Sequence, residues 1–529
     1  MSNAASNEII TLPKGGGALH GMGEKFSPDL HTGTGNFTIP IALPAGRNGF
    51  QPQLNLVYST GNGNGPFGLG WNLGIPGVSR KTSKGVPRYD EAKDVFILSG
   101  AEDLVPVETL GATTRYRPRT EGLFAEILYH RDATNSYWEV RSKDGLKSFY
   151  GTEALFGTDP ATIANPSNRT NVFTWKLTHT EDPFENRIEY EYERDSAEEG
   201  PHHWDQLYLK QIHYADYDDA GTLKSLVSVS FEYEERRDLE GRDLDPFSEY
   251  RSGFEIRTRK RCTRIVVRTH AKQDEKVRTY DFIYLDQRPE LKASLPINKV
   301  SLLSQIKVTG HDGNSTETLP PLEFNYTRFM PEKRDFFPLQ GSDLPARSLA
   351  NPDLEFVDLF GNGLPDLIEM NGTVRYWRNL GGGRFDLPRF MQDAPAGLAL
   401  ADSGVQFIDA NGDGRTDLLV TTAALSGYFP LRFGGQWDRK SFQRFRQAPS
   451  FNLEDPEVKM VDLDGDGVTD AIRSGSRLEC FFNDPKEGWK DTRWVERQAL
   501  EVFPNVNFSD PRVKWADMTG DMLQDIALV

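Results

Sequence analysis

Four aspartate-rich segments recur in the last third of this chain, and they restrict its fold more than any other feature of the sequence. In each segment, an aspartate follows a short apolar stretch, and a second aspartate stands eight residues later. The leading aspartates, spaced 51, 53 and 55 residues apart, are Asp358, Asp409, Asp462 and Asp517. A period of about 50 residues built from short strands is typical of β-propellers. We therefore expect residues 351–529 to form propeller blades, the last one incomplete because the sequence ends just after Asp525.

The second and third segments have the composition of cation-binding loops. Oxygen-bearing side chains stand at positions 1, 3, 5 and 9 of each loop. They are Asp409, Asn411, Asp413 and Asp417 in the second loop, and Asp462, Asp464, Asp466 and Asp470 in the third. Ca²⁺ prefers about six to eight oxygen ligands, and the glycine after position 5 permits the sharp bend that turns several oxygens inward. These eight residues are therefore candidate Ca²⁺ ligands.

Position 12 and the flanking sequences separate these loops from EF-hands. Val420 and Arg473 stand where an EF-hand has a glutamate, and the flanks read as strands rather than helices. The alternative to metal binding is an Asx turn, in which the acidic side chains accept hydrogen bonds from backbone amides. The first and fourth loops favour that alternative, because Phe360 and Thr519 occupy position 3.

Alternation of apolar and polar residues predicts the secondary structure of the remaining chain. Arg187–Glu193 reads R-I-E-Y-E-Y-E, and Val227–Glu234 reads V-S-V-S-F-E-Y-E. Period-2 patterns rich in tyrosine, phenylalanine, valine and isoleucine indicate half-buried strands. We therefore expect an all-β protein of antiparallel sheets. Its predicted parts are an N-terminal arm (1–14), a β-rich domain (15–335), a linker (336–350) and the blades (351–529).

Charge and composition exclude several functions. The formal net charge is −17, whereas affinity for nucleic acid needs clustered lysine and arginine. No apolar run approaches the roughly 20 residues of a membrane span. We therefore expect no nucleic-acid partner and no direct membrane insertion. The two cysteines, Cys262 and Cys480, cannot by themselves form a disulfide framework or a zinc site.

The N-terminal region carries a specific resemblance to a known domain. Its pieces are L-P-K-G-G-G at 12–17, G-M-G at 21–23, I-P-I at 39–41, L-N-L-V-Y-S-T-G-N-G-N-G-P-F-G-L-G-W at 54–71 and G-V-P-R-Y-D at 85–90. Together they resemble the SpvB-type domain that opens the B component of bacterial Tc (insecticidal) toxin complexes. The turn and tyrosine-bearing strand at 182–192 are similar to an Rhs-like unit. We interpret the glycines of 65–70 as tight turns beside a buried Trp71 and not as a nucleotide-binding loop, because no helix pattern follows them.

The aspartate loops, in turn, resemble the FG-GAP/VCBS repeats of integrin-type propellers. The two resemblances imply a non-catalytic structural and docking component of a toxin complex. Residues 15–335 would form part of a β-sheet cocoon around a toxic cargo, and the propeller would dock to the translocation channel and gate it. The implied partners are a pore-forming A component and an Rhs-type, cargo-bearing C component.

No catalytic constellation stands out in the sequence, so we expect no enzyme, no catalytic residue and no cofactor-binding residue. The E-x-E motif of ADP-ribosyltransferases occurs at Glu189–Glu191, but we interpret it as a solvated strand face. His202, His203 and Asp205 could suggest a metal site, yet a charged loop after Glu199 explains them as well.

Two alternatives remain open. One is a Ca²⁺-dependent, integrin-like adhesion or glycan-binding propeller, and the other is a carrier region for a downstream effector enzyme. Residues 1–14 lack the apolar core of a signal peptide. The expected location is therefore secreted without an evident signal peptide, or cytoplasmic before release.

Overall fold

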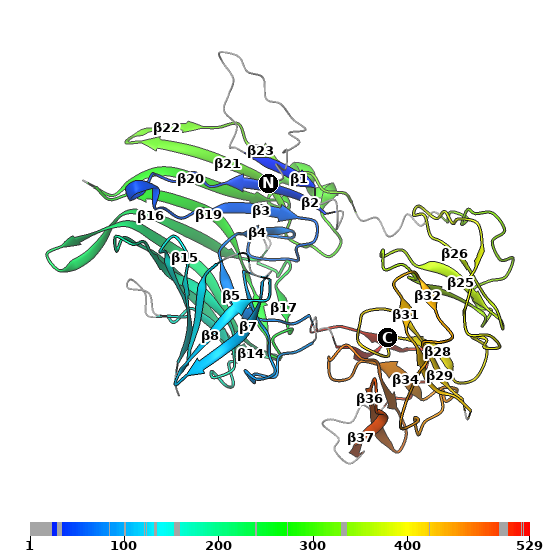
Figure 1. Ribbon diagram of the computed structural model, residues 1–529. Helices are drawn as coiled ribbons and strands as arrows, with labels where there is room; N and C mark the ends of the chain where they lie inside the picture. Colours follow the sequence, from blue (N-terminus) through cyan, green and yellow to red (C-terminus); the bar gives the residue numbers. More distant parts are fainter. Residues whose placement is uncertain are drawn as a thin grey trace, which may run out of the picture. The chain divides into compact units, whose positions relative to one another are not determined.

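The computed structural model describes the chain except for residues 1–23, 29–33, 84, 100–101, 121, 123, 132–134, 153–158, 238–240, 272, 329–335, 423, 497–505, 520 and 522. The predicted N-terminal arm, residues 1–14, lies outside the described residues. The described chain is all-β, as predicted, and its helices are three short 3-10 turns (Figure 1). They are η1 (Arg47–Gly49), η2 (Leu285–Gln287) and η3 (Pro289–Ser294). Within the described ranges, none of these helices has the length and apolarity that a membrane span requires.

The chain divides into two compact units. The first, here called the sheet unit, comprises the chain up to Lys81 with Tyr89–Ser248 and Phe254–Phe329. The second, here called the repeat unit, comprises Met330–Val529 together with two short segments from earlier in the chain. Those segments are Thr82–Arg88 and Glu249–Gly253.

The sheet unit begins with a small antiparallel sheet that covers part of its core. The strands, which pair in sequence order, are β1 (Lys25–Pro28), β2 (Gly35–Pro40), β3 (Asn55–Ser59) and β4 (Trp71–Leu73). The glycine-rich run between β3 and β4 turns tightly, with φ of +86° at Gly68 and +83° at Gly70. The backbone N–H of Leu69 donates to the carbonyl of Ser301 at 2.9 Å, and Trp71 is buried. The run is therefore structural, as the sequence indicated.

The larger part of the sheet unit is one closed antiparallel sheet. Its strands are β5 (Gly77–Arg80), β6 (Phe96–Leu98), β7 (Glu102–Leu110), β8 (Thr113–Pro118), β9 (Glu126–Arg131), β10 (Ser136–Arg141), β11 (Lys147–Tyr150), β12 (Thr162–Ala164), β13 (Val172–Glu181), β14 (Arg187–Glu199), β15 (His202–Asp219), β16 (Thr222–Glu235), β19 (Lys260–Thr269), β20 (Glu275–Tyr284), β21 (Leu303–Asp312), β22 (Ser315–Thr318) and β23 (Leu322–Glu323). A separate pair consists of β17 (Phe247–Glu249) and β18 (Ile256–Thr258). One closing contact joins β13 to β5, where Trp175 lies opposite Val78.

Aromatic side chains fill the core where β13 meets β5. Trp138 stacks on Tyr129 with ring centroids 4.5 Å apart, and Phe96 meets Trp138 edge-on at 5.0 Å. Tyr116 and Trp175 complete this buried cluster. Truncating one such buried aromatic ring to alanine typically costs about 3–5 kcal/mol. Aromatic residues at alternate positions of these strands thus point inward and fill the core of the closed sheet.

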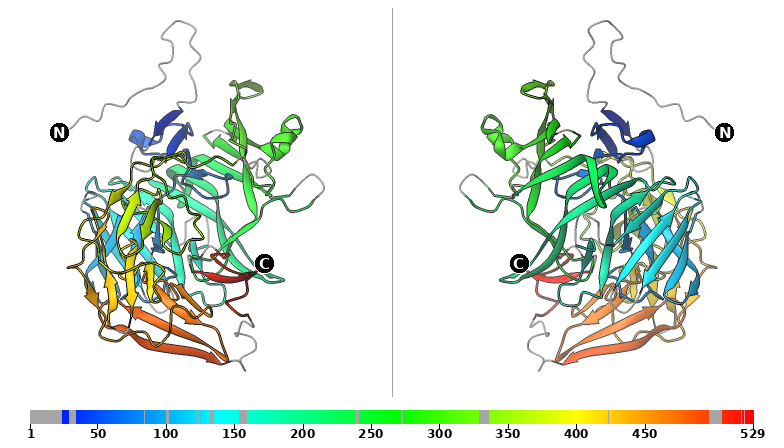
Figure 2. Two further views of the ribbon diagram at one scale, coloured as in Figure 1. Left: turned by 90° about the vertical axis from the view of Figure 1, so that its right-hand side faces the viewer. Right: turned by 90° about the vertical axis from the view of Figure 1, so that its left-hand side faces the viewer.

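The repeat unit consists of four consecutive antiparallel sheets. The first three have four strands each: β24 (Leu354–Val357), β25 (Asp366–Met370), β26 (Val374–Trp377) and β27 (Arg389–Phe390); β28 (Val405–Ile408), β29 (Asp417–Thr421), β30 (Ser426–Phe429) and β33 (Gln443–Arg444); β34 (Val458–Val461), β35 (Asp470–Arg473), β36 (Arg477–Asp484) and β37 (Gly488–Glu496). The fourth contains β38 (Val513–Ala516) and β39 (Asp525–Leu528), and a hairpin of β31 (Leu431–Arg432) and β32 (Gln436–Trp437) follows β30. In Figure 2, β36 and β37 form the long orange hairpin.

Consecutive sheets pack face to face, which is the arrangement of propeller blades. Leu418 and Val420 of β29 share a core with Ile368 of the first sheet. Leu419, on the opposite face of β29, shares a core with Ala471 of the third sheet. A strand with both faces covered needs apolar residues at successive positions instead of alternation. This explains why apolar residues stand at adjacent positions in these strands, as at Leu367–Ile368, Leu418–Val420 and Ala471–Ile472.

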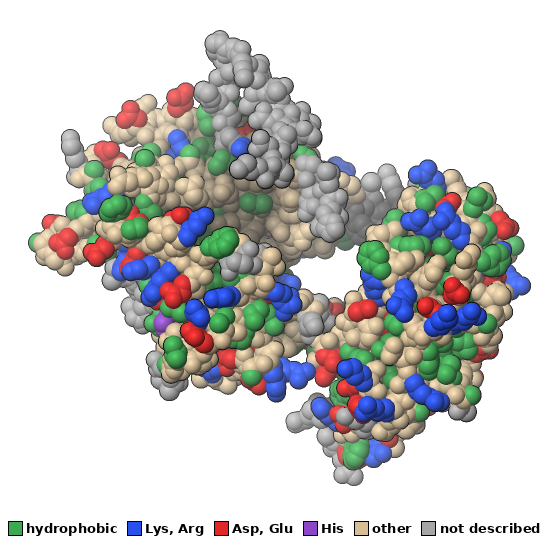
Figure 3. Space-filling model, in the orientation of Figure 1, with side chains coloured by type: hydrophobic (Ala, Val, Ile, Leu, Met, Phe, Trp, Pro, Cys, Tyr) green, Lys and Arg blue, Asp and Glu red, His purple; other side chains and the backbone are tan. Residues whose placement is uncertain are grey.

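Charged side chains are mixed over the surface. Figure 3 shows basic and acidic side chains interspersed on the visible face of each unit. The net charge of −17 is therefore not concentrated in one patch on that face.

Candidate functional site

Each aspartate loop connects the first two strands of its blade. The leading aspartate follows the first strand directly, and the aspartate at position 9 opens the second strand. In the second loop, for example, Asp409 follows β28, while Asp417 begins β29 opposite Ile408. Strand pairing therefore brings the two ends of each loop together, and the four loops occupy equivalent positions in their blades.

In the second and third loops, the aspartate at position 9 is buried and bonds both to its own loop and to a residue at or just beyond the end of the hairpin that follows. Asp417 is fully buried and accepts N–H groups from Ala410 at 3.1 Å and Leu431 at 3.0 Å. Asp470, 2% exposed, accepts N–H groups from Leu463 at 3.1 Å and Asn483 at 2.8 Å. Such bonds satisfy backbone donors that would otherwise be buried without a partner. Sequence inspection identified these residues only as candidate ligands, whereas the structure shows that they also hold the loop.

Burial changes the acidity of these two carboxyls. It raises the pKa of Asp417 to about 7 and that of Asp470 to about 7, because the charged form loses its hydration. The neighbouring acids raise each pKa further, while the backbone N–H donors oppose the rise. A cation next to either carboxylate would remove much of this cost, so the loops are electrostatically suited to bind one.

The aspartates at position 1 fold the loop around themselves. Asp409 accepts N–H groups from Gly412 and Gly414, both at 2.8 Å. Asp462 accepts N–H groups from Gly465 at 2.8 Å and Gly467 at 2.9 Å.

The side chains at positions 3 and 5 each accept the N–H two residues ahead. The acceptors are Asn411, Asp413, Asp464 and Asp466. These contacts are the Asx turns that the sequence offered as the alternative to metal binding. A carboxylate has about four acceptor sites, so these turns leave oxygen lone pairs for a cation.

Three carboxylates converge in the third loop. One oxygen from each of Asp462, Asp464 and Asp470 lies within 4.8 Å of the others. Ca²⁺–oxygen distances are about 2.3–2.6 Å, so oxygens with that separation can contact the same ion. In the second loop, Asp409 and Asp413 lie close enough to raise the pKa of Asp417. Among the described residues, the oxygens of Asp462, Asp464 and Asp470 in the third loop converge to this extent, whereas those of Asp409, Asp413 and Asp417 in the second loop do not. Ca²⁺ itself stays a prediction for both loops.

The first loop has the same turns, but the residue at position 3 is Phe360, which offers no oxygen ligand. Asp358 accepts N–H groups from Asn362 at 3.2 Å and Gly363 at 2.7 Å. The Phe360 ring at position 3 lies beneath the Arg378 guanidinium, 4.4 Å from it. In the fourth loop, Asp517 accepts the N–H of Asp521 at 3.1 Å. Both loops are consistent with Asx turns.

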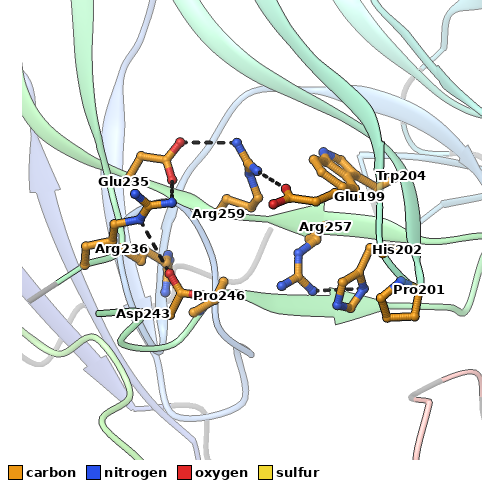
Figure 4. Close-up of a pocket in the computed structure, with 12 residues that line it drawn as sticks. Glu199, Pro201, His202, Trp204, Glu235, Arg236, Asp243, Pro246, Arg257 and Arg259 are labelled. Carbon is orange, nitrogen blue, oxygen red and sulfur yellow. Dashed lines mark hydrogen bonds and ion pairs between the residues drawn. The ribbon is translucent and has the colours of Figure 1, made fainter. Parts of the chain in front are cut away.

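The sheet unit contains a cavity of about 330 Å³ that no sequence motif indicated (Figure 4). Its lining includes Trp204, His202 and four arginines, which are Arg236, Arg237, Arg257 and Arg259. Arg259 lies over the Trp204 ring, 4.9 Å from its centroid, and pairs with Glu235 at 3.2 Å and Glu199 at 3.3 Å. Because acids accompany the arginines, the cavity wall is an ion-pair network. Its residues come from strands that are distant in sequence, so no local motif marked it.

His202 opens strand β15, which corrects the charged-loop interpretation. Its Nδ1 lies 2.7 Å from Glu255 Oε1, and the N–H of His203 donates to the other oxygen of Glu255 at 2.8 Å. Burial raises the pKa of Glu255, but the bonds from Ser248, His202 and His203 together hold it below its usual value. His202 therefore contacts a buried carboxylate at the start of a strand.

Glu189 and Glu191 do not form the solvated strand face that the sequence suggested. They are only 2% and 8% exposed. Glu189 lies 3.3 Å from Arg187, and Glu191 lies 3.4 Å from the His213 ring. These contacts with neighbouring side chains accompany the burial of both carboxylates, which alternation alone could not reveal.

Two family models match the chain. The family described as Salmonella virulence plasmid 65kDa B protein matches residues 29–271, and the FG-GAP-like repeat matches residues 352–420. The mono(ADP-ribosyl)transferases SpvB of Salmonella typhimurium (strain 14028s / SGSC 2262) and Salmonella dublin are each 29% identical over 327 residues. Each match covers 51% of this chain and 52% of the relative. The chain thus spans about half the length of the curated relatives it matches.

Solved structures extend the likeness to both units. A chain of the Photorhabdus luminescens Tc holotoxin pore is similar over 99% of this chain and 26% of that chain, with a TM-score of 0.77 and 27% identity. The TcdB2–TccC3 crystal structure matches over 98% of this chain and 32% of that chain, with a TM-score of 0.57 and 23% identity, which supports the fold. The predicted resemblance to an SpvB domain followed by FG-GAP repeats is confirmed.

Proposed function

Because the chain carries an SpvB domain followed by FG-GAP-like repeats, we propose that it is a non-catalytic structural component of a bacterial toxin complex. The observation that carries this proposal is the likeness to the Tc holotoxin pore chain, which extends over 99% of the sequence at 27% identity. In this role, the closed sheet contributes part of a cocoon around a toxic cargo. The repeat unit docks to the translocation channel and gates cargo exit.

The proposed partners follow from the same likeness. They are a pore-forming A component and an Rhs-type, cargo-bearing C component. The rigid blades suit docking, because loops at the ends of packed strands present a fixed surface to a partner. The test is size-exclusion chromatography and surface binding with a purified A component, with and without a C component. Co-elution with the A component supports the role, and no binding at micromolar concentration contradicts it.

A second test addresses catalysis, because the curated relatives are named as mono(ADP-ribosyl)transferases. We expect this chain neither to hydrolyse NAD nor to transfer ADP-ribose to proteins. The buried state of Glu189 and Glu191 supports this expectation, since neither carboxylate is free to meet a substrate. The measurement is release of nicotinamide and labelling by tagged NAD. Activity that disappears in Glu189→Gln or Glu191→Gln would overturn the non-catalytic role.

We also propose that the second and third aspartate loops bind Ca²⁺. For the third loop, the converging oxygens of Asp462, Asp464 and Asp470 support this, because the ion would neutralise carboxylates that otherwise repel one another. For the second loop, the support is the shared residue pattern and the effect of Asp409 and Asp413 on the pKa of Asp417. Thermal unfolding of the full chain should shift upward in Ca²⁺ and downward in chelator. The double variant Asp413→Asn/Asp464→Asn should lose most of the shift. An unchanged unfolding curve in chelator would remove the metal from the proposal.

A further inference from the structure

An early segment of the chain packs directly against the third aspartate loop. Residues Thr82–Arg88 belong to the repeat unit, although they precede the repeats by more than two hundred residues in sequence. Gly85 has φ +97°, and a Cβ placed there would lie 2.5 Å from the carbonyl oxygen of Gly465 and 2.7 Å from its Cα. The two glycines therefore bring backbone against backbone, a contact that no side chain would permit.

The same segment places the positive charge of Arg88 next to the candidate ligands of the third loop. Arg88 Nη2 lies 3.6 Å from Asp464 Oδ2, with the arginine side chain 54% and the aspartate side chain 37% exposed. Asp464 is one of the three residues whose oxygens converge in this loop. The charge of Arg88 also lowers the pKa of Asp466, although burial has the larger and opposite effect there. The guanidinium thus interacts with the same acids that a divalent cation would use.

The second loop provides an internal comparison. Its own arginine, Arg415, lies over the ring of Phe433, 5.1 Å from the ring centroid. Among the ion pairs of the described residues, none joins a lysine or arginine to Asp409, Asp413 or Asp417. The two loops share the sequence pattern, but a distant segment of the chain supplies a cation only to the third.

We propose that Arg88 is a built-in competitor for Ca²⁺ at the third aspartate loop. The inference rests on the Ca²⁺ binding proposed above. Binding of the ion to Asp464 releases the guanidinium, so the occupancy of the loop is linked to the attachment of the segment that carries Arg88. An exposed ion pair is worth about 0.2–1 kcal/mol, so removing it should tighten Ca²⁺ binding about 1.4- to five-fold.

The test is calorimetric titration of the full chain with Ca²⁺ after chelator treatment. In the Asp409→Asn/Asp413→Asn background, which leaves the third loop intact, Arg88→Gln should tighten Ca²⁺ binding about 1.4- to five-fold. In the Asp462→Asn/Asp464→Asn background, which leaves the second loop intact, the same substitution should leave the affinity unchanged. Arg439→Gln, an exposed arginine of the same unit paired at 3.8 Å with Asp393, is the matched control.

The outcomes separate the two proposals. Ca²⁺ binding that is identical with and without Arg88 overturns the competition and leaves the Ca²⁺ proposal standing. Equal tightening at both loops also overturns it, because the effect would then come from net charge alone. Absence of Ca²⁺ binding in both backgrounds and in the unaltered chain overturns both proposals. Tightening confined to the third loop supports the competition.

Discussion

The stability of the repeat unit should fall as pH rises from 5 to 8 in the absence of Ca²⁺. Asp417 and Asp470 have folded-state pKa values of about 7, above the value of about 3.9 expected in the unfolded chain. At pH values between about 3.9 and 7, these two carboxyls hold two protons in the folded protein that the unfolded chain has released. Their stabilising contribution is complete below about pH 4 and is lost as pH rises through 7.

The magnitude follows from linkage between proton binding and unfolding. From pH 5 to pH 8, the difference in bound protons integrates to about 1.9 pH units per carboxyl, or about 2.6 kcal/mol at 1.36 kcal/mol per unit. The two carboxyls together correspond to about 5 kcal/mol. The sequence makes this a clean measurement, because residues 330–529 contain no histidine.

The assay is thermal unfolding of the full chain in chelator at pH 5, 6, 7 and 8, followed by tryptophan fluorescence. The transition assigned to the repeat unit should move to lower temperature as pH rises. The double variant Asp417→Asn/Asp470→Asn should lose most of this slope, because asparagine does not titrate. Burial also raises the pKa of Asp366, Asp409 and Asp466, which keep the remainder. Asp393→Asn, an exposed position in the same unit, is the control and should keep the slope. A wild-type midpoint that stays constant or rises over this range would refute the reasoning.

Two further predictions concern stability alone. Gly488→Ala should destabilise the repeat unit by about 3 kcal/mol or more, because the added Cβ would lie 2.2 Å from the carbonyl oxygen of Gln447. Gly363→Ala should cost about 1 kcal/mol, because Gly363 has φ +76° but open space around it. Denaturant unfolding of both variants compares the two free energies. Arg236→Ala should destabilise the sheet unit by about 3–5 kcal/mol. Arg236 pairs with Asp245 at 2.7 Å, and its loss would leave Asp245 as an uncompensated buried charge. A thermal unfolding midpoint within 1 °C of that of the unaltered chain would contradict this.

Much of the fold could be predicted from local patterns. The strand at Arg187–Glu193 was visible because side chains in a strand alternate between faces, and the structure extends it to β14. The aspartate loops were visible because positions 1 and 9 perform the same local task in every blade. The candidate ligands of such a loop lie within nine consecutive residues, so they can be identified without knowing which strands pair.

Contacts between distant segments could not be predicted in this way. The approach of Arg88 to Asp464 depends on where the chain between them travels. The burial of Glu189 depends on the residues that surround it in the folded chain. In both cases, the residue type is compatible with an exposed surface, and only its surroundings decide otherwise.

The sequence by itself determined an all-β chain, its repeating blades and the resemblance to SpvB and FG-GAP proteins, because strand period, turn residues and loop ligands are all set by neighbours along the chain. Only the tertiary structure decided that Asp417 and Asp470 are buried with raised pKa values, and that one loop receives an arginine from a remote segment. The physical reason is that desolvation and ion pairing depend on which atoms surround a charge, and folding brings those atoms from distant parts of the chain.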